Sequence, residues 1–300
     1  MTKLTSLGEA ITEFLQPGNT LYASGFTHLI PFAAGHEIIR QGITDLVLAR
    51  ATPDLIYDQM VAAGCARKLI FSYMGNPGVG SLRRVRAAIE AGTLDWEEYS
   101  HFSMISRLQA GASGLPFMPM KQTGALDLMH HNPNYQTVDD PYSEEKVVVV
   151  PPLKPDLAIV HVQRADIKGN AQVWGILGEQ RLAAFASEHV ILTAEEIVDE
   201  AVIRSDPNRT LIPGLVVDAV CHVPYCAHPS YTQGYHDRDN DFYLGWDEIS
   251  KTEAGVQDYL EEWVYGLPDR AAYWEKLGPE VHKCLTAGER YSEPINYGAY

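Results

Sequence analysis

Short apolar runs alternate with amphipathic stretches over the first ninety residues of the chain. Three of these runs are apolar enough for strands that are buried on both faces, at 20–24, 45–51 and 68–74. The stretches between them repeat apolar residues every three or four positions, which predicts helices at 31–41, 53–64 and 81–92. Strands that alternate with helices pair in parallel through right-handed crossovers. The pattern therefore predicts an α/β fold with an open, mainly parallel sheet and helices on both faces.

Capping signals extend this assignment toward both ends of the chain. Ser6 with Glu9 forms a capping box for an N-terminal helix that ends at Pro17-Gly18. A further helix is expected from about Trp96 to Ala112, and buried strands at 147–152 and 156–162. The run 189–203 predicts a strand that leads into a helix capped by Thr193, with Glu196 as its box partner. Another strand is predicted at 214–225.

The chain shows no internal repeat and no linker-like change of composition, so we expect a single domain that spans residues 1–300. A polar segment at about 121–146 is predicted to be an inserted functional or partner-contacting loop, with a local hairpin as the alternative. A C-terminal helical segment is expected at about 246–300. It carries Trp246, Trp263 and Trp274.

The charge and cysteine content narrow the possible partners. Acidic residues outnumber basic ones by 39 to 23, for a net charge of −16. Such a surface repels polyphosphates and anionic lipids, so neither nucleic acid nor membrane is an expected partner. No signal-peptide core and no run of about 18 apolar residues is found, which predicts a cytoplasmic protein. The 4 cysteines lack a Cys-x-x-Cys pair and are expected to be reduced.

The first strand ends in the turn Ser24-Gly25-Phe26, and Pro31 is expected in the first turn of the helix that follows. A glycine turn between a strand and a helix N-terminus is how α/β proteins build anion and cofactor sites, although such a glycine is more often only a turn. The later turn at 75–80, GNPGVG, has the same placement and precedes three arginines. It either binds phosphate or shapes an acyl or pantetheine channel. Neither turn has a nucleotide-binding fingerprint.

Other candidate motifs are incomplete. Three aspartates and Glu248 imitate a calcium loop, but Phe242 stands at the position that needs glycine. The histidines of the same region, His222, His228 and His236, do not follow zinc spacings, so no metal site is expected. The acidic pair Glu97 and Glu98 is expected to stabilise a helix start. No serine lies in a Gly-x-Ser-x-Gly elbow, and no complete catalytic constellation can be assembled.

Several stretches resemble a known enzyme family. The Gly-x-Thr opening at 18–20, three apolar residues, the small-Gly-Phe turn and Pro31 resemble the N-terminal signature of class I coenzyme A transferases. Seven further stretches, in the same order along nearly the whole chain, resemble the α-type subunit of glutaconate CoA-transferase and its relatives: RQGITDL (40–46), EEYS (97–100), GLPFMP (114–119), AIVHVQRADIKGNAQVWG (158–175), IPGLVVDAV (212–220), PYCAHPS (224–230) and ISKT (249–252).

The resemblance implies a half-enzyme. An α-type subunit pairs with a homologous β-type subunit, and the β-type subunit carries the glutamate that forms acyl-anhydride and glutamyl-CoA intermediates. This chain is then expected to contain no catalytic nucleophile and no permanently bound cofactor, with coenzyme A as a substrate. Ser24, Gly25 and Phe26 are expected to stabilise oxyanions at the end of their strand. Ser24 stands where the commonest family pattern has glycine.

The same resemblance implies a set of pocket residues, which are Thr27, His28, Tyr73, Asn76 and Gly78. A dicarboxylic substrate would need a cation at the far end of the pocket, for which Arg107, Lys121 and Arg164 are unranked candidates.

Two alternatives stay open. Related α/β pairs cleave carbon–carbon bonds in CoA thioesters of ring-degradation intermediates. They use no β-subunit nucleophile but an essential glutamate of the α-type subunit, in the region that corresponds to 98–102. Here His101 or a neighbour stands there, so His101 and Glu98 are the acid/base candidates of a hydrolase. The chain is otherwise a non-catalytic partner-binding subunit.

Overall fold

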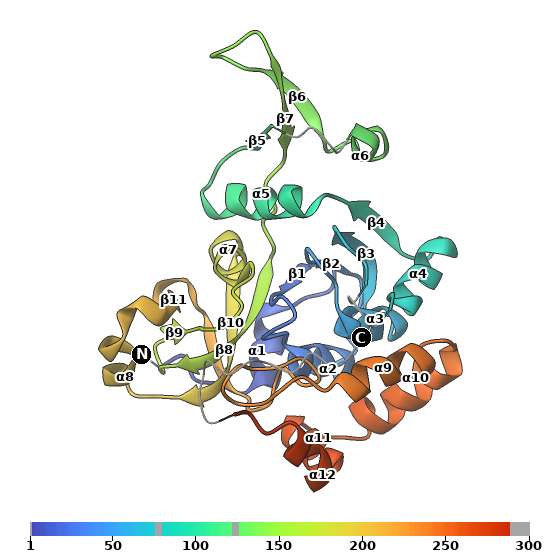
Figure 1. Ribbon diagram of the computed structural model, residues 1–300, viewed down its shortest axis with the longest axis vertical. Helices are drawn as coiled ribbons and strands as arrows, with labels where there is room; N and C mark the ends of the chain where they lie inside the picture. Colours follow the sequence, from blue (N-terminus) through green and yellow to red (C-terminus); the bar gives the residue numbers. More distant parts are fainter. Residues whose placement is uncertain (1, 76–79, 122–125, 289–300) are drawn as a thin grey trace.

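The computed structural model describes residues 2–75, 80–121 and 126–288 of the chain. A nine-stranded sheet runs through its middle, and seven of the strands are parallel in the order β4-β3-β2-β1-β8-β10-β12 (Figure 1). These strands are β1 (Thr20–Ala23), β2 (Leu46–Ala49), β3 (Ala66–Phe71), β4 (Asp95–Glu98), β8 (Leu157–Ala165), β10 (His189–Ile197) and β12 (Ala219–His222). Two short antiparallel strands extend the sheet beside the end of β8: β9 (Ala171–Gln172) and β11 (Thr210–Ile212).

Helices cover both faces of the sheet, and each face has its own hydrophobic core. The first core contains side chains from α1 (Leu7–Phe14), α2 (Phe32–Arg40), α3 (Leu55–Ala62), α4 (Arg83–Glu90), α9 (Asn240–Ile249), α10 (Glu253–Leu260) and the π-helical turn Glu261–Tyr265. The second contains side chains from α5 (His101–Ala112) and α7 (Gln180–Ala186). The remaining helical elements are α6 (Leu126–His131), α8 (Glu200–Ser205), α11 (Arg270–Leu277), α12 (Pro279–Cys284) and the 3-10 turns Pro207–Arg209 and Gly214–Val216. The predicted fold class is confirmed.

A second, antiparallel sheet projects from the body beyond α5 (Figure 1). It consists of β5 (Met118–Met120), β6 (Gln136–Asp139) and β7 (Lys146–Val150) in the order β5-β7-β6. The polar segment 121–146 thus contains α6 and β6, and β6 pairs with β7 as a hairpin. The hairpin alternative for this segment describes the structure better than a loop.

Two predicted helix starts are wrong. Residues 95–98 form β4 at the edge of the sheet, and α5 begins only at His101, so Glu97 and Glu98 do not lie at a helix start. Residues 189–197 form β10 without a break, and Thr193 lies buried within it. The following helix, α8, begins at Glu200 with Asp199 in the N-cap position.

Contacts within the sheet explain both errors. Glu196 on β10 pairs with Arg164 of the neighbouring β8, and Glu97 on β4 pairs with Lys68 of β3. Acidic side chains with such partners are tolerated in strands, although the local sequence matches a capping box. The Ser6–Glu9 box at the start of α1 is confirmed, and Pro31 is the N-cap of α2 rather than a residue of its first turn.

The connectivity creates a topological switch point beside β1. The chain proceeds from β1 through β2 and β3 to β4 at one side, and later returns to place β8 on the other side of β1. Ligands of open α/β sheets bind where the strand order reverses, outside the carboxyl ends of the strands. The turn that begins at Ser24 follows β1 directly, so it lies at this switch point. Among the described residues, no helix is long and apolar enough to cross a membrane.

Candidate functional site

The turn after β1 has an unusual backbone that glycine makes possible. Gly25 has φ of +117°, and a Cβ at this position would lie 2.7 Å from the carbonyl oxygens of both His28 and Leu29. Thr27 and Leu29 also have positive φ, at 54° and 58°. Non-glycine residues adopt this region at an energetic cost that the surrounding structure must offset, and such residues cluster at functional sites.

Two hydroxyl groups of this turn are buried without a partner. Ser24 is fully buried, and neither its Oγ nor Thr27 Oγ1 has a hydrogen-bond partner in the described structure. The backbone around them is held firmly, because Ser24 N–H donates to Ile159 O and Thr27 O accepts from Ser230 Oγ at 2.8 Å. Both hydroxyls are therefore fixed in place with unused hydrogen-bonding capacity.

His28 connects the turn to two other segments. It is fully buried, its Nδ1–H donates to Ile176 O at 3.1 Å, and its Nε2 accepts from Gln233 N–H at 3.0 Å. Burial is the main cause that lowers its pKa to about 3, so the imidazole is neutral. Because both ring nitrogens are used by backbone groups, His28 holds the turn in place.

Arg50 is a buried cation beside the turn that the sequence reasoning missed. It follows β2, is 1% exposed, and its Nη2 donates to Gly25 O at 2.5 Å. Its Nε and Nη1 have no partner in the described structure. The sequence signal was present, because Arg50 is the one charged side chain of the apolar run 45–51 beyond its first residue, Asp45.

A loop from the second half of the chain packs on the same turn and was also missed. A Cβ on Gly178 would lie 2.8 Å from Phe26 Cβ, so the two segments are in close contact. Next in this loop, Glu179 is buried and accepts a hydrogen bond from Tyr22 OH at 3.1 Å. Burial raises the pKa of Glu179, and the charge of Arg50 opposes that shift. Gln180 Nε2 is buried without a partner in the described structure. We call Ser24, Thr27, Arg50, Glu179 and Gln180 the turn cluster.

His101 lies at the edge of this cluster, at the start of α5. Its Nε2 is 2.7 Å from Thr52 Oγ1 and its Nδ1 is 2.8 Å from Ser72 Oγ. Its ring meets that of Phe26 edge-on, with centroids 6.5 Å apart. Both nitrogens thus bond to hydroxyls that follow β2 and β3.

The other predicted site residues occupy different positions. Tyr73 follows β3, its N–H donates to Ala51 O at 3.1 Å, and its side chain is about half exposed. Asn76 and Gly78 lie outside the described residues. Glu98 belongs to β4, at the edge strand of the sheet.

The three candidate cations for a dicarboxylate each have an acidic neighbour. Arg107 Nη1 lies 3.7 Å from Glu97, Lys121 Nζ lies 3.6 Å from Glu145, and Arg164 Nε lies 2.8 Å from Glu196. None of these pairs belongs to the turn cluster. Arg50 is the cation that the fold brings to the turn.

Exposed apolar side chains surround the turn cluster. These are 37–59% exposed, and we call them the apolar rim: Phe26, Tyr73, Phe102, Ile176 and Leu177. They come from the turn after β1, the segment after β3, the start of α5 and the segment before α7. Large exposed apolar residues that surround polar groups are typical of interaction surfaces.

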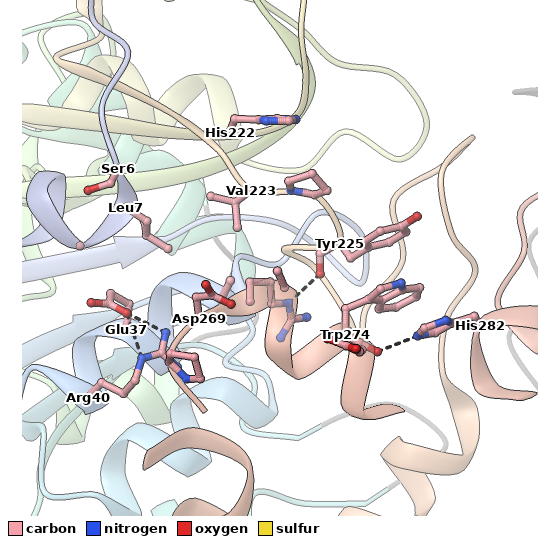
Figure 2. Close-up of a pocket in the computed structure, with 17 residues that line it drawn as sticks. Ser6, Leu7, Glu37, Arg40, His222, Val223, Tyr225, Asp269, Trp274 and His282 are labelled. Carbon is pink, nitrogen blue, oxygen red and sulfur yellow. Dashed lines mark hydrogen bonds and ion pairs between the residues drawn. The ribbon is translucent and has the colours of Figure 1, made fainter. Parts of the chain in front are cut away.

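A large cavity of the described structure lies away from the turn cluster. It has a volume of about 690 Å³ and lies between α1, α2, the loop after β12, and α11 with α12 (Figure 2). Tyr225, Trp274 and His282 stack along it, with ring centroids 3.8 Å and 4.4 Å apart. No residue of the turn cluster lines it. Among the described residues, no group of three His, Cys, Asp or Glu side chains is arranged to hold a metal ion.

Comparison with known proteins agrees with this geometry. Residues 4–222 match the family model of coenzyme A transferase. The A-type subunit of the 3-oxoadipate CoA-transferase of Pseudomonas knackmussii is 46% identical over 280 residues, which cover 92% of this chain and 99% of the relative. The A-type subunit of the glutaconate CoA-transferase of Acidaminococcus fermentans is 36% identical over 296 residues, which cover 93% and 92%.

Comparison with solved structures indicates the same family. The crystal structure of the Acidaminococcus fermentans glutaconate CoA-transferase superposes with a TM-score of 0.91 at 34% identity, and covers 96% of each chain. A cholesterol ring-cleaving hydrolase IpdA subunit of Mycobacterium tuberculosis is more distant, with 27% identity over 88% of this chain and 94% of the relative. The chain therefore belongs to the coenzyme A transferase family, as the α-type subunit of a CoA-transferase with two kinds of subunit.

Proposed function

We propose that this subunit forms one wall of a shared active site that moves coenzyme A from an acyl-CoA to a carboxylic acid. The acyl group binds at the switch point beside the turn cluster, and a glutamate from a β-type subunit is the nucleophile. The observation that carries the proposal is the set of buried hydrogen-bonding groups without partners in the described structure, on Ser24, Thr27, Arg50 and Gln180.

Unpaired buried polar groups oppose folding. Each one costs about 1–3 kcal/mol relative to a paired group, so several in one small region require an explanation. An acyl carbonyl or a carboxylate at the switch point supplies the missing acceptors, which supports a substrate site. The groups lie in the segments directly after β1 and β2 and at the start of α7, so the folded chain orients them before any substrate binds.

The turn cluster does not supply a nucleophile of its own. Its carboxylate, on Glu179, is 3% exposed and already bound by Tyr22 OH. Its hydroxyls, on Ser24 and Thr27, have no hydrogen-bond partner in the described structure, so no base is in contact with them to take a proton. A nucleophile from another chain completes the site.

The proposed reaction is an exchange of acyl partners. The partner's glutamate attacks the thioester carbonyl, releases the CoA thiolate and becomes an acyl anhydride. The thiolate attacks the glutamyl carbonyl of the anhydride, which releases the first acid and leaves a glutamyl-CoA thioester. The second acid repeats these steps in reverse. Each attack places negative charge on a carbonyl oxygen, which Ser24 Oγ–H and the backbone N–H groups of the turn are suited to stabilise.

The apolar rim is the proposed contact with the β-type subunit. Its five side chains bury more apolar area when a partner covers them, and they surround the groups that need the partner's glutamate. The partner also closes the site to water, which keeps the anhydride from hydrolysing. The single domain and the cytoplasmic location stay predictions.

The similarity to a 3-oxoadipate CoA-transferase subunit makes that acid the first substrate to test. The experiment compares the purified chain, a matching β-type subunit by itself, and the two together. The donor is 3-oxoadipyl-CoA and the acceptors are a panel of mono- and dicarboxylic acids. CoA transfer is expected only when both chains are present. Borohydride reduction of the donor-treated pair is expected to modify one glutamate of the β-type subunit.

Other outcomes would overturn the proposal. Exchange by the isolated chain would contradict the half-enzyme. Hydrolysis of the acyl-CoA without transfer of CoA to any acid would contradict the transferase and favour a hydrolase. Binding of the β-type subunit without any turnover would favour a non-catalytic role.

A further inference from the structure

We propose that Arg50 is a positioning residue that orients and polarises the Gly25–Phe26 peptide, so that the Phe26 N–H acts as an oxyanion donor. The inference rests on the proposed function. It adds a role to a residue that no sequence motif singles out.

One peptide connects Arg50 to the turn. Arg50 Nη2 donates to Gly25 O at 2.5 Å. In a planar trans peptide the C=O and the following N–H point in opposite directions. The Phe26 N–H therefore points away from Arg50, and the side chain of Phe26, 37% exposed, belongs to the apolar rim.

The buried charge of Arg50 strengthens the donor at the other side of this peptide. Arg50 is 1% exposed, so water screens its guanidinium poorly. The positive guanidinium beside the carbonyl oxygen draws electron density toward that oxygen, which makes the N–H of the same peptide a stronger donor. An N–H that is fixed before the reaction stabilises a developing oxyanion without reorganisation.

Burying the charge of Arg50 opposes folding, and a structural role alone does not explain that cost. Arg50 leaves Nε and Nη1 without partners in the described structure, which opposes folding. Nearby charges reduce the cost, because Arg50 attracts the buried carboxylates of Glu179 and Asp54. A purely structural role would be served at lower cost by a neutral donor. Only the charge adds donor strength to the turn.

Direct contact between Arg50 and the substrate is the competing role. In that role Nε and Nη1, which have no partner in the described structure, would donate to the ligand. The two roles differ in kinetics, because a group that binds the substrate in its ground state changes KM, whereas a group that acts on the oxyanion changes kcat.

The test uses the complex of both subunits. Arg50→Met keeps most of the side-chain length and removes the charge, and Arg50→Lys keeps the charge but loses the planar fork. The matched control is Arg40→Met, since Arg40 lies on α2 in an ion pair with Glu37. Assembly with the β-type subunit, thermal stability, steady-state transfer and the rate of glutamyl-CoA formation are measured for each.

For Arg50→Met we expect kcat and the rate of glutamyl-CoA formation to fall by about 10- to 100-fold, because one donor is weakened rather than removed. KM is expected to change less than about threefold, and Arg50→Lys to recover part of kcat. Arg40→Met is expected to match the wild type. Unchanged kcat, or a large rise in KM with kcat unchanged, would overturn the inference.

If Arg50→Met does not assemble, Arg50→Gln replaces it, because it keeps a neutral donor and removes the charge, and wild-type kcat in that variant would overturn the inference. Failure of the wild-type pair to transfer CoA would overturn the proposed function instead, so the two failures are distinguishable.

Discussion

Replacement of Ser24 by alanine is expected to affect stability and activity in opposite directions. Ser24 Oγ is buried and has no partner in the described structure, so its removal breaks no hydrogen bond. An unpaired buried hydroxyl costs about 1–3 kcal/mol, and the small void left by one oxygen costs about 1 kcal/mol. The free energy of unfolding should therefore stay unchanged or rise by up to about 2 kcal/mol. At about 2–4 °C per kcal/mol, Tm should stay equal or increase by a few degrees.

Ser103 is the matched control, because it is also a fully buried serine but its Oγ is bonded. It contacts Ser100 Oγ at 2.8 Å and accepts from Tyr135 OH at 2.8 Å. Ser103→Ala removes both of these hydrogen bonds, so it should lower the free energy of unfolding by about 1–3 kcal/mol. Differential scanning fluorimetry of wild type, Ser24→Ala and Ser103→Ala at one scan rate makes this comparison.

The transfer assay of the two-subunit complex supplies the second half of the prediction. If Ser24 Oγ–H donates to the acyl oxygen, Ser24→Ala should lower kcat by at least about tenfold, whereas Ser103→Ala should keep kcat within about twofold. A Tm drop in Ser24→Ala as large as that of Ser103→Ala would show that the hydroxyl has a partner. An unchanged kcat would refute its role in acyl transfer.

Three more predictions follow from single groups. Gly25→Ala should destabilise the chain by about 2–6 kcal/mol because of strain and the 2.7 Å contacts, whereas Gly42→Ala, with φ of +65° and open space, should cost about 1–2 kcal/mol in the same thermal scans. Burial lowers the pKa of His28 to about 3, so the unfolded chain binds a proton below pH 6.5 that the folded chain does not. The free energy of unfolding therefore decreases as pH falls from 6.5 toward 3. Between pH 7.5 and 5.0, this decrease should be smaller in His28→Gln than in wild type by up to about 2 kcal/mol, as measured by urea unfolding. Of the four thiols, only exposed Cys284 should react rapidly with a thiol reagent in the native chain, and rapid labelling of more than one would contradict the structure.

Local patterns were sufficient for most of the fold. Apolar runs separated by amphipathic stretches specified β1 to α4, because each element there buries a continuous apolar face. Patterns failed where tertiary contacts satisfy polar residues. Glu97 and Glu196 look like helix-start residues, and their partners Lys68 and Arg164 on neighbouring strands are far away in sequence.

The candidate site was predictable only in part for the same reason. The turn at Ser24 has a local signal, since a small residue, glycine and proline follow a buried strand within a few positions. Glu179 and Gln180 have no such signal, because it is the fold that returns their loop to the turn, about 150 residues later in the sequence. Arg50 had a local signal that the sequence analysis did not use, because it is a charged residue in an apolar run that predicts a buried strand.

The turn cluster itself argues for a second chain. A folded protein rarely keeps two unpaired hydroxyls and a partly paired guanidinium beside one strained turn, because each opposes folding. These groups cannot act on an acyl-CoA without a nucleophile, and the carboxylate beside them is bound by Tyr22. The exposed apolar side chains around them are equally unfavourable in an isolated chain. A β-type subunit would bury the apolar rim and bring the missing glutamate through one interface. Polar substitutions in the rim should therefore abolish assembly and activity together.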